Sequence, residues 1–193
     1  MEANINNIIK ERRSIYPREY SGKLLDDSII QTLLENANYA PNHKSNYPWR
    51  FIIIKGNSLN SWIQKAADIY KEQTPAEKFK QEKMDKTLNY QQQVSHAIAI
   101  VCHRETESST IAIEDHCAVA AAVQNMYLSL HQYPNAGGYW STGLGTYSKP
   151  MHDFLGLGEN DLLMGYFVLG HVEQKRTEGM RKKIDHFVSS LNL

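Results

Sequence analysis

Apolar positions along this chain alternate between the helical period and short continuous runs, and the two patterns predict different elements. Periodic stretches bounded by cap residues or breakers predict helices, and these cover residues 4–13, 27–39, 58–72, 111–132, about 149–155 and a C-terminal tail over about 178–191. Continuous apolar runs predict strands at residues 49–55, 94–103 and about 162–172. Helices interleaved with a few strands indicate an α+β sheet with helices packed on it.

Three stretches add detail to this outline. Residues 94–103 give the clearest strand pattern and predict a central strand buried on both faces. The helix over 111–132 carries small side chains on every side around Ala118–Val123, which is typical of a buried helix that another backbone approaches closely. Residues 73–93, rich in Lys, Gln and Glu, predict a solvated and mobile helical segment. No repeat, linker or change of composition divides the chain, so we expect one domain over residues 1–193.

The composition is that of a soluble globular protein, with 41% hydrophobic and 22% charged residues. Because 21 basic residues balance 21 acidic ones, we expect no nucleic-acid partner, and a few local cations must hold any anionic ligand. Cys102 and Cys117 are expected to be buried free thiols, which suits a reducing compartment. The N-terminus has no apolar leader and no run reaches membrane-spanning length, which predicts a cytoplasmic protein with no membrane partner.

A polar loop between two prolines, Pro41 and Pro48, is the most informative stretch for function. Proline fixes its own backbone and biases the preceding residue toward an extended shape, so the loop is stiff. It ends on Trp49–Phe51 and runs directly into an apolar strand. His43 alone is typical of an ordinary surface histidine, and Lys44 of a solvated charge. Polar groups on a rigid loop beside a core are, however, what a ligand site needs.

Three further stretches carry candidate binding groups. Arg12-Arg13-Ser14 ends the first helix, where a guanidinium can bind phosphate oxygens, although cations at a helix C-terminus also stabilise its dipole. Trp140–Gly143 follows two glycines, and it offers either an aromatic wall with close backbone N–H groups or a core tryptophan beside a turn. Lys175-Arg176 follows the last strand and alone is typical of a surface pair.

Taken together, these pieces resemble the FMN-binding nitroreductase family. The shared order is Arg-Arg-Ser, the loop ending in Pro-Trp-Arg-Phe, an alanine-rich helix carrying Gln124-Asn125-Met126, the Trp-Ser-Thr-Gly turn, then Leu169-Gly170 and a basic residue. The resemblance spans about residues 8–180. Each motif alone is weak, but chance rarely reproduces their order and spacing together.

The resemblance implies an α+β nitroreductase-like fold, with a mainly antiparallel central sheet flanked by helices, in an intertwined homodimer that shares two flavin sites. It implies FMN as cofactor and NADH or NADPH as electron donor. Arg12, Ser14 and Arg176 would hold the phosphate and ribityl chain, with Arg13 contributing at least its backbone. The remaining implied flavin contacts are Pro41, Asn42, His43, Lys44, Tyr47, Gln124, Trp140, Ser141, Thr142 and Gly143.

The chain departs from the family pattern at Tyr16, where many relatives have a further arginine. Part of the phosphate binding is therefore expected from Arg176 or Lys175. Lys44 would place a cation near N1 and the C2 carbonyl of a reduced flavin, as an oxyanion hole does. Residues 57–93 match no motif of the family, so they leave the shape of the substrate open.

The implied activity is FMN-dependent NAD(P)H oxidoreduction, a ping-pong two-electron (hydride) reduction of nitroaromatics, quinones or related electron-poor acceptors. The sequence has no nucleophile elbow, zinc motif or Rossmann glycine fingerprint. We therefore expect no catalytic side chain and no metal, and a nicotinamide that binds as a substrate. Two alternatives stay open: an FMN-binding protein without turnover, as a flavin store or redox sensor, or a different flavin redox reaction on the same fold.

Overall fold

The computed structural model describes residues 4–105, 110–175 and 179–191. Its centre is an antiparallel sheet of four strands in the order β1-β2-β4-β3. The strands are β1 (Trp49–Lys55), β2 (His96–His103), β3 (Ala136–Ser141) and β4 (Asp161–His171). This architecture confirms the predicted α+β class with a mainly antiparallel sheet.

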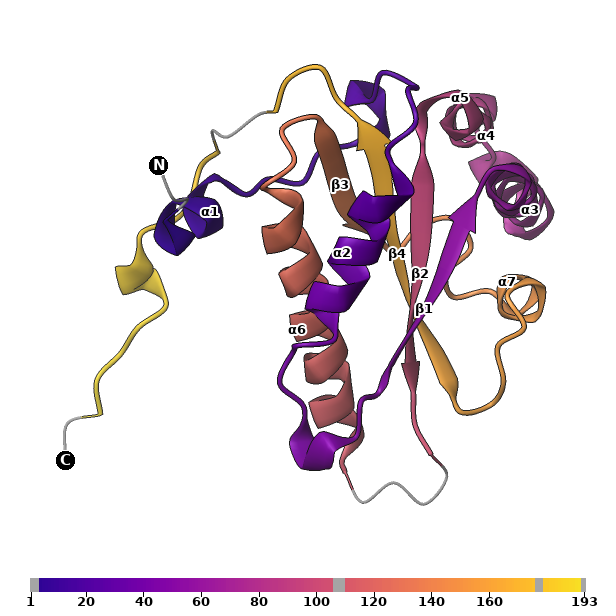
Figure 1. Ribbon diagram of the computed structural model, residues 1–193. Helices are drawn as coiled ribbons and strands as arrows, with labels where there is room; N and C mark the ends of the chain where they lie inside the picture. The colour runs from indigo at the N-terminus through magenta and orange to yellow at the C-terminus, as the bar shows by residue number, and fades with distance from the viewer. Residues whose placement is uncertain (1–3, 106–109, 176–178, 192–193) are drawn as a thin grey trace.

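Helices cover both faces of the sheet, so the molecule has three layers (Figure 1). One face carries α2 (Asp27–Ala37) and α6 (Ala112–Leu130), and the other carries α3 (Asn57–Gln73), α4 (Gln81–Leu88), α5 (Tyr90–Gln93) and α7 (Lys149–Phe154). The first helix, α1 (Ile5–Glu11), stands outside these layers beside the C-terminal tail. Short 3-10 turns are η1 (Pro17–Glu19), η2 (His43–Ser45), η3 (Ala76–Lys78) and η4 (Ile184–His186).

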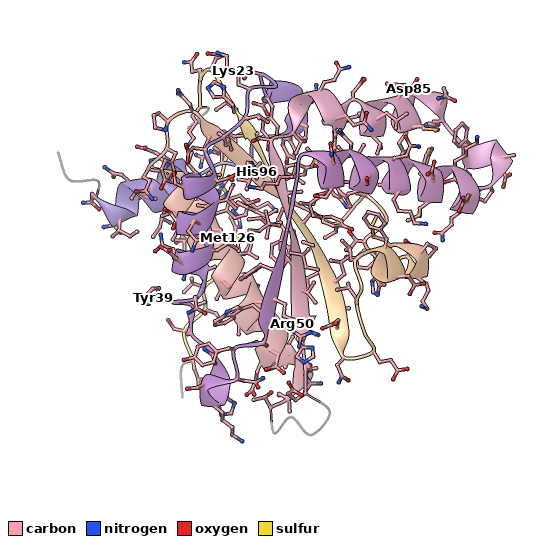
Figure 2. The ribbon with its side chains drawn as sticks, turned by 45° about the vertical axis from the view of Figure 1, so that its right-hand side comes forward. Lys23, Tyr39, Arg50, Asp85, His96 and Met126 are labelled. Carbon is pink, nitrogen blue, oxygen red and sulfur yellow. The ribbon has the colours of Figure 1, made fainter. Side chains whose placement is uncertain are left out.

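Strand β2 is buried on both faces, as its sequence predicted. Alternate residues point to opposite sides of a strand. Ala97 therefore joins the core beneath α3, which includes Trp62, whereas Ile98 joins the core beneath α6, which includes Met126. Figure 2 shows Met126 inside the layer between helix and sheet. Among the described residues, no helix combines the length and apolar character needed to cross a membrane.

Strand β3 was not predicted, because its first half reads as a turn. Gly137 and Gly138 have low strand propensity, yet both pair with β4. A Cβ atom on Gly137 would lie 2.9 Å from Val172, and one on Gly138 would lie 2.9 Å from Leu130. The tight packing of this strand against its neighbours thus requires the glycines that conceal it in the sequence.

The predicted C-terminal helix is wrong for the described residues 179–191, which hold only the short turn η4. The tail leaves the body of the molecule (Figure 1). Its large apolar side chains are 64% or more exposed, and they are Met180, Ile184, Phe187, Val188 and Leu191. An isolated segment of this length forms no stable helix without tertiary packing.

The small side chains of helix α6 predicted a helix buried on every side. Within one chain this prediction is wrong, because one side of the helix is exposed. One side of the helix stays open, with Ile113 61% exposed and Gln124 exposed. Cys117 lies on this side and is exposed, which corrects the prediction of a buried thiol, whereas Cys102 is buried as predicted. The sheet and α2 cover the other sides of the helix.

A bulge in β4 fixes the side chain of Trp140. The pairing of β2 with β4 shifts at this point, so that Met164 is an extra residue. The indole N–H of Trp140 donates to the Met164 carbonyl at 2.9 Å. The next residue, Gly165, has φ of +123°, and a Cβ there would lie 2.3 Å from the Ser141 carbonyl oxygen.

We predict that Gly165→Ala lowers the free energy of unfolding by on the order of 3 kcal/mol, because it adds both backbone strain and overlap with β3. Gly156→Ala is the matched control, since Gly156 also has positive φ (+68°) but open space around a Cβ. The control should lose only about 1 kcal/mol. Urea unfolding of both variants measures the difference, and equal losses would contradict the packing argument.

Candidate functional site

The side chain of Tyr127 on α6 contacts three residues that the sequence singled out. The Trp140 backbone N–H donates to the Tyr127 Oη at 2.6 Å. The Ser14 Oγ lies 3.3 Å from the same oxygen. The Arg12 guanidinium carbon stands 4.7 Å from the centre of the Tyr127 ring. Arg12 and Ser14 therefore lie at one place with Trp140, although Trp140 is more than 120 positions away in the sequence.

The segment that carries Arg12 and Ser14 is held against the sheet. The Ile15 N–H donates to the Gly138 carbonyl on β3 at 3.1 Å. The Tyr20 hydroxyl lies 2.8 Å from the Ile15 carbonyl oxygen and 3.0 Å from that of Val168 on β4. Gly170 makes room for this ring, because a Cβ there would lie 2.2 Å from it. Ile15, which directly follows Ser14, is thus fixed relative to β3 and β4.

Cationic side chains line a hollow beside this group, together with Gly137 and Gly138. Arg12, Arg13 and Lys175 all contribute to its wall. Arg13 also closes α1, since its Nη1 donates to the Lys10 and Arg12 carbonyls at 2.7 Å each. Burial lowers the pKa of Lys175 to about 8, so the ammonium is mostly charged at neutral pH. Its Nζ donates to the Leu130 carbonyl at 2.7 Å.

Two other residues that line the hollow, Glu11 and His131, lie close to each other. Glu11 lines its rim, and its carboxylate lies 3.5 Å from His131 Nε2. Arg12, Arg13 and Lys175 are the cationic side chains of its wall. Arg176, also predicted for this role, lies outside the described residues.

Two further hollows are larger than this one. One, of about 680 Å³, lies between η1 and helices α4 and α5, and Tyr16, Arg18, Lys86 and Tyr90 are among its lining residues. The Tyr16 ring packs on Tyr139, next to Trp140, with 5.0 Å between the centroids. The other hollow, of about 380 Å³, is lined by residues 142–148 and by parts of α3 and α4.

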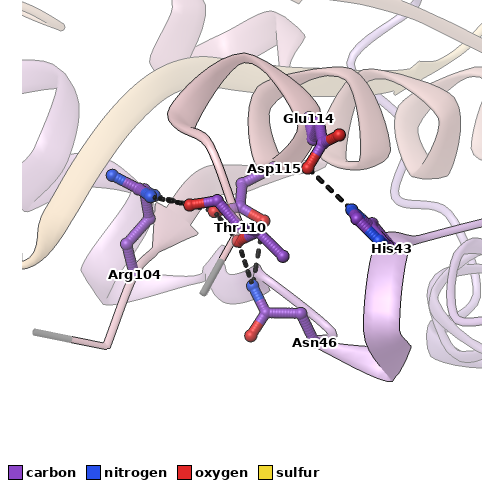
Figure 3. A network of polar contacts seen from close by, with 6 residues as sticks. All are labelled: His43, Asn46, Arg104, Thr110, Glu114 and Asp115. Carbon is purple, nitrogen blue, oxygen red and sulfur yellow. Dashed lines mark hydrogen bonds and ion pairs between the residues drawn. The ribbon is translucent and has the colours of Figure 1, made fainter. Parts of the chain in front are cut away.

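The predicted loop over residues 41–47 lies at the opposite end of α6. Asn46 donates to Asp115 in the first turn of this helix at 2.9 Å, and His43 Nδ1 lies 2.8 Å from Glu114 Oε2 (Figure 3). Asp115 and Tyr127 are 12 positions apart on one helix, which corresponds to about 18 Å along its axis. One chain therefore does not bring the loop to the group around Tyr127.

The backbone of this loop is strained. Lys44, Ser45 and Tyr47 have φ values of +55°, +52° and +47°, although none of them is glycine. Each such residue costs on the order of 1 kcal/mol. Within the loop, the Tyr47 N–H donates to the Asn42 side chain at 3.0 Å. Strain of this kind persists where surrounding contacts determine the conformation, and it is concentrated at functional sites.

Two neighbouring residues on α6 face different ways. Gln124, a predicted flavin contact, lies exposed on the open side of the helix. The Asn125 side chain instead donates to the Asn36 carbonyl on α2 at 3.1 Å. Within one chain, Gln124 therefore contacts neither the loop over residues 41–47 nor the group around Tyr127. Asn125 instead joins α6 to α2.

A serine–histidine–aspartate relay elsewhere in the chain is structural. Ser95 Oγ lies 2.8 Å from His96 Nδ1, and His96 Nε2 lies 2.9 Å from Asp27 Oδ1. Ser95 is only 2% exposed and accepts from the Leu25 N–H at 2.8 Å, so no substrate reaches its oxygen. Figure 2 places His96 in the interior of the molecule. The relay joins the start of α2 to β2.

Comparison with known proteins assigns the family. The model described as the Nitroreductase family matches residues 9–171, so the chain belongs to the nitroreductase family, a family of oxidoreductases. The chain is 29% identical over 175 residues to YfhC of Bacillus subtilis, which is named as a provisional NAD(P)H nitroreductase. The match covers 88% of this chain and 85% of that protein. This assignment confirms the family that the sequence motifs resembled.

Solved structures confirm the nitroreductase-like fold. A nitroreductase-like family protein from Bacillus cereus has a TM-score of 0.80 at 22% identity and covers 99% of this chain and 97% of its own. The FMN-dependent nitroreductase NfnB from Mycobacterium smegmatis, solved in complex with NADPH, has a TM-score of 0.73 at 13% identity and covers 97% of each chain.

Tyr127 is the site residue that the sequence did not reveal. Within the helical pattern it reads as one more core aromatic, and burial raises the pKa of its hydroxyl, which stays neutral. Its one visible signal is a hydroxyl within the apolar pattern close to the end of the helix. A buried hydroxyl needs partners, and here the partners are the candidate binding residues.

We predict that Tyr127→Phe lowers the free energy of unfolding by about 1–2 kcal/mol, because the Trp140 N–H loses its acceptor. Tyr147→Phe is the control, since Tyr147 is 75% exposed. Urea unfolding measures both variants. A loss no larger than in the control would show that the hydroxyl does not hold β3 to α6.

Proposed function

We propose that this chain is an FMN-dependent NAD(P)H oxidoreductase that reduces nitroaromatics, quinones or related electron-poor acceptors. The observation that carries the proposal is the convergence of Arg12, Ser14 and Trp140 on Tyr127, beside the cationic hollow that Lys175 lines. A cationic end next to an aromatic and backbone-rich wall fits a ligand that is anionic at one end and flat at the other. FMN has this form.

The residues present fit FMN in both parts. Arg12, Arg13 and Lys175 would hold the phosphate, and Arg176 keeps its predicted place in that role. Lys175 is a half-buried ammonium whose pKa burial has lowered, and a bound phosphate dianion would favour its charged form. Ser14 would bind the ribityl chain.

The ring system would lie against Trp140, Ser141, Thr142 and Gly143, at the end of β3 and in the turn after it, where Thr142 and Gly143 line the hollow of about 380 Å³. When bound, FMN would supply two-electron hydride chemistry between a nicotinamide and the acceptor, in a ping-pong sequence. The hollow of about 680 Å³ next to Tyr16 leaves room for each of these substrates in turn. The names of the relatives, an NAD(P)H nitroreductase and an FMN-dependent nitroreductase solved with NADPH, support the choice of cofactor and donor.

A homodimer would complete the site. The loop residues Pro41, Asn42, His43, Lys44 and Tyr47 lie about 18 Å along α6 from the Arg12 group. Two antiparallel copies of α6, packed through its open side, would bring the loop of one copy to the Arg12 group of the other. Gln124 lies on that open side. Lys44 of the incoming loop would then stabilise negative charge on the reduced ring.

Exposed apolar surface supports this dimer. The exposed Ile113 and Cys117 and the half-buried Ala120 form one apolar stripe on α6 with the spacing i, i+4, i+7, and the polar Gln124 continues it at i+11. The C-terminal tail adds large exposed apolar side chains that a second copy would cover, such as Phe187 (68%) and Leu191 (84%). In this proposal residues 1–193 act as one FMN-binding domain in the cytoplasm, without nucleic acid or membrane.

We predict that the purified protein is yellow and that Arg12→Ala weakens FMN binding at least about tenfold, because a charge-assisted contact to the phosphate is lost. Lys149→Ala is the control, since Lys149 is an exposed cation on α7. Titration of the apoprotein with FMN, followed by flavin fluorescence, measures both. Full affinity in Arg12→Ala would refute the phosphate site.

Anaerobic mixing of the yellow protein with NADH or NADPH separates an enzyme from a flavin store. Bleaching of the flavin absorbance, followed by recovery when a nitroarene or quinone is added, is the expected result. A yellow protein that neither nicotinamide bleaches would favour the store or sensor.

We predict that Ala120→Arg converts the dimer into monomers and removes FMN binding, because a charged side chain would enter the stripe between the two helices. Asn60→Arg, on the exposed face of α3, is the control and should stay dimeric. Sedimentation velocity measures the mass of each variant, and absorbance measures its flavin content. A wild type that sediments as a monomer, yet holds FMN fully, would refute the shared site.

A further inference from the structure

The carboxylate of Asp115 forms a junction between α6, the segment after β2 and the loop over residues 41–47 (Figure 3). Its side chain is 3% exposed. It accepts from Arg104 Nε at 2.7 Å and from Asn46 Nδ2 at 2.9 Å, and the Thr110 hydroxyl lies 2.9 Å from both of its oxygens. Burial raises the pKa of this carboxyl, but these donors outweigh burial, so the pKa is lowered and the group is charged at neutral pH.

We propose that Asp115 is a positioning residue that holds the flavin-contacting loop in its strained shape through Asn46. This inference rests on the proposed function, since the loop has a ligand only if FMN binds. Asn46 lies inside the strained run, after Lys44 and Ser45 and directly before Tyr47. The Asn46 amide, which donates to Asp115 at 2.9 Å and more weakly to the Thr110 hydroxyl at 3.4 Å, therefore ties the left-handed residues to the start of α6.

The geometry explains why a carboxylate occupies this position. Arg104 and Asn46 both present N–H groups, which can only donate, and each meets a different Asp115 oxygen. The Thr110 hydroxyl can turn and accept instead. An asparagine in place of Asp115 has one acceptor oxygen, so Arg104 and Asn46 would compete for it. A carboxylate satisfies both at once.

The bonds between Asp115 and its neighbours do more than stabilise the N-terminus of α6. An acidic residue in the first turn of α6 is favourable without any loop, and Arg104 alone would neutralise the buried charge. Asn46, 69 positions away in sequence, adds a bond from the loop to this pair. A second bond, from His43 to Glu114, reaches the same turn of α6 at 2.8 Å. The start of α6 is thus a platform on which the loop is fixed.

The test compares Asn46→Ala, Asp115→Asn and the double variant with the wild type. Asn46→Ala deletes the loop's donor and leaves the Arg104–Asp115 pair intact. The matched control is Gln64→Ala, which deletes an amide-to-carboxylate bond of 2.9 Å to Asp68 on the exposed face of α3. All variants are made in the full-length chain and titrated with FMN as apoprotein.

We expect Asn46→Ala and Asp115→Asn each to weaken FMN binding about tenfold or more. The double variant should bind no worse than the weaker single variant, since both changes remove the same bond. The flavin midpoint potential of FMN-saturated Asn46→Ala should become more negative, because Lys44 is less well placed to stabilise the reduced ring. A purely structural role would leave this potential unchanged. Gln64→Ala should match the wild type in every measurement.

The possible failures are distinguishable. A wild type that binds no FMN overturns the proposed function. Limited trypsin digestion then tests the role of Asp115 without any ligand. If Asp115 holds the loop, both single variants should be cleaved after Lys44 faster than the wild type. Cleavage at the wild-type rate overturns the role of Asp115 in holding the loop. A wild type that binds FMN, with unchanged affinity in both variants or with additive losses in the double variant, overturns the assignment of Asp115 alone.

Discussion

The length of one rigid helix governs the arrangement of the candidate site. Helix α6 spans 19 residues and packs beside α2 on one face of the sheet, and it holds Asp115 near its start and Tyr127 near its end. The residues that resemble the family's flavin contacts divide between these two ends, about 18 Å apart along the axis. A helix packed on a sheet does not bend to close such a gap. The open apolar side of α6 and the exposed C-terminal tail then acquire a common explanation, since a second antiparallel copy would bring unlike ends together.

The same physical device fixes the irregular backbone at each end of α6. A buried polar atom must find partners, because burying it without them costs several times the net contribution of an ordinary hydrogen bond. Tyr127 meets this demand with Ser14 and the Trp140 N–H, and Asp115 meets it with Arg104, Thr110 and Asn46. Segments without regular hydrogen bonding are thereby tied to a rigid element. Ser95, His96 and Asp27 tie α2 to β2 by similar means, away from any ligand.

Hydrophobic patterning predicted elements correctly where local and tertiary forces agree. The strand over residues 49–55 was predicted with the bounds of β1, and the helix over 58–72 differs from α3 by one residue at each end. Patterning failed where tertiary packing overrides local preference. Gly137 and Gly138 form a strand because β4 and the adjoining side chains leave space for nothing larger. The apolar periodicity of the C-terminal tail predicted a helix, but the described chain provides no surface for that helix to pack on.

The sequence by itself determined the α+β class, the order of the family motifs and the candidate residues Arg12, Ser14 and Trp140, because period, turn chemistry and motif spacing are local properties. The tertiary structure alone decided which of these residues meet and what holds them. Ser14 and Tyr127 lie 113 positions apart, and Asn46 and Asp115 lie 69 apart. Contacts across such separations depend on the register of the strands and on the packing of the helices. Neither of these can be read from the periodicity of the sequence.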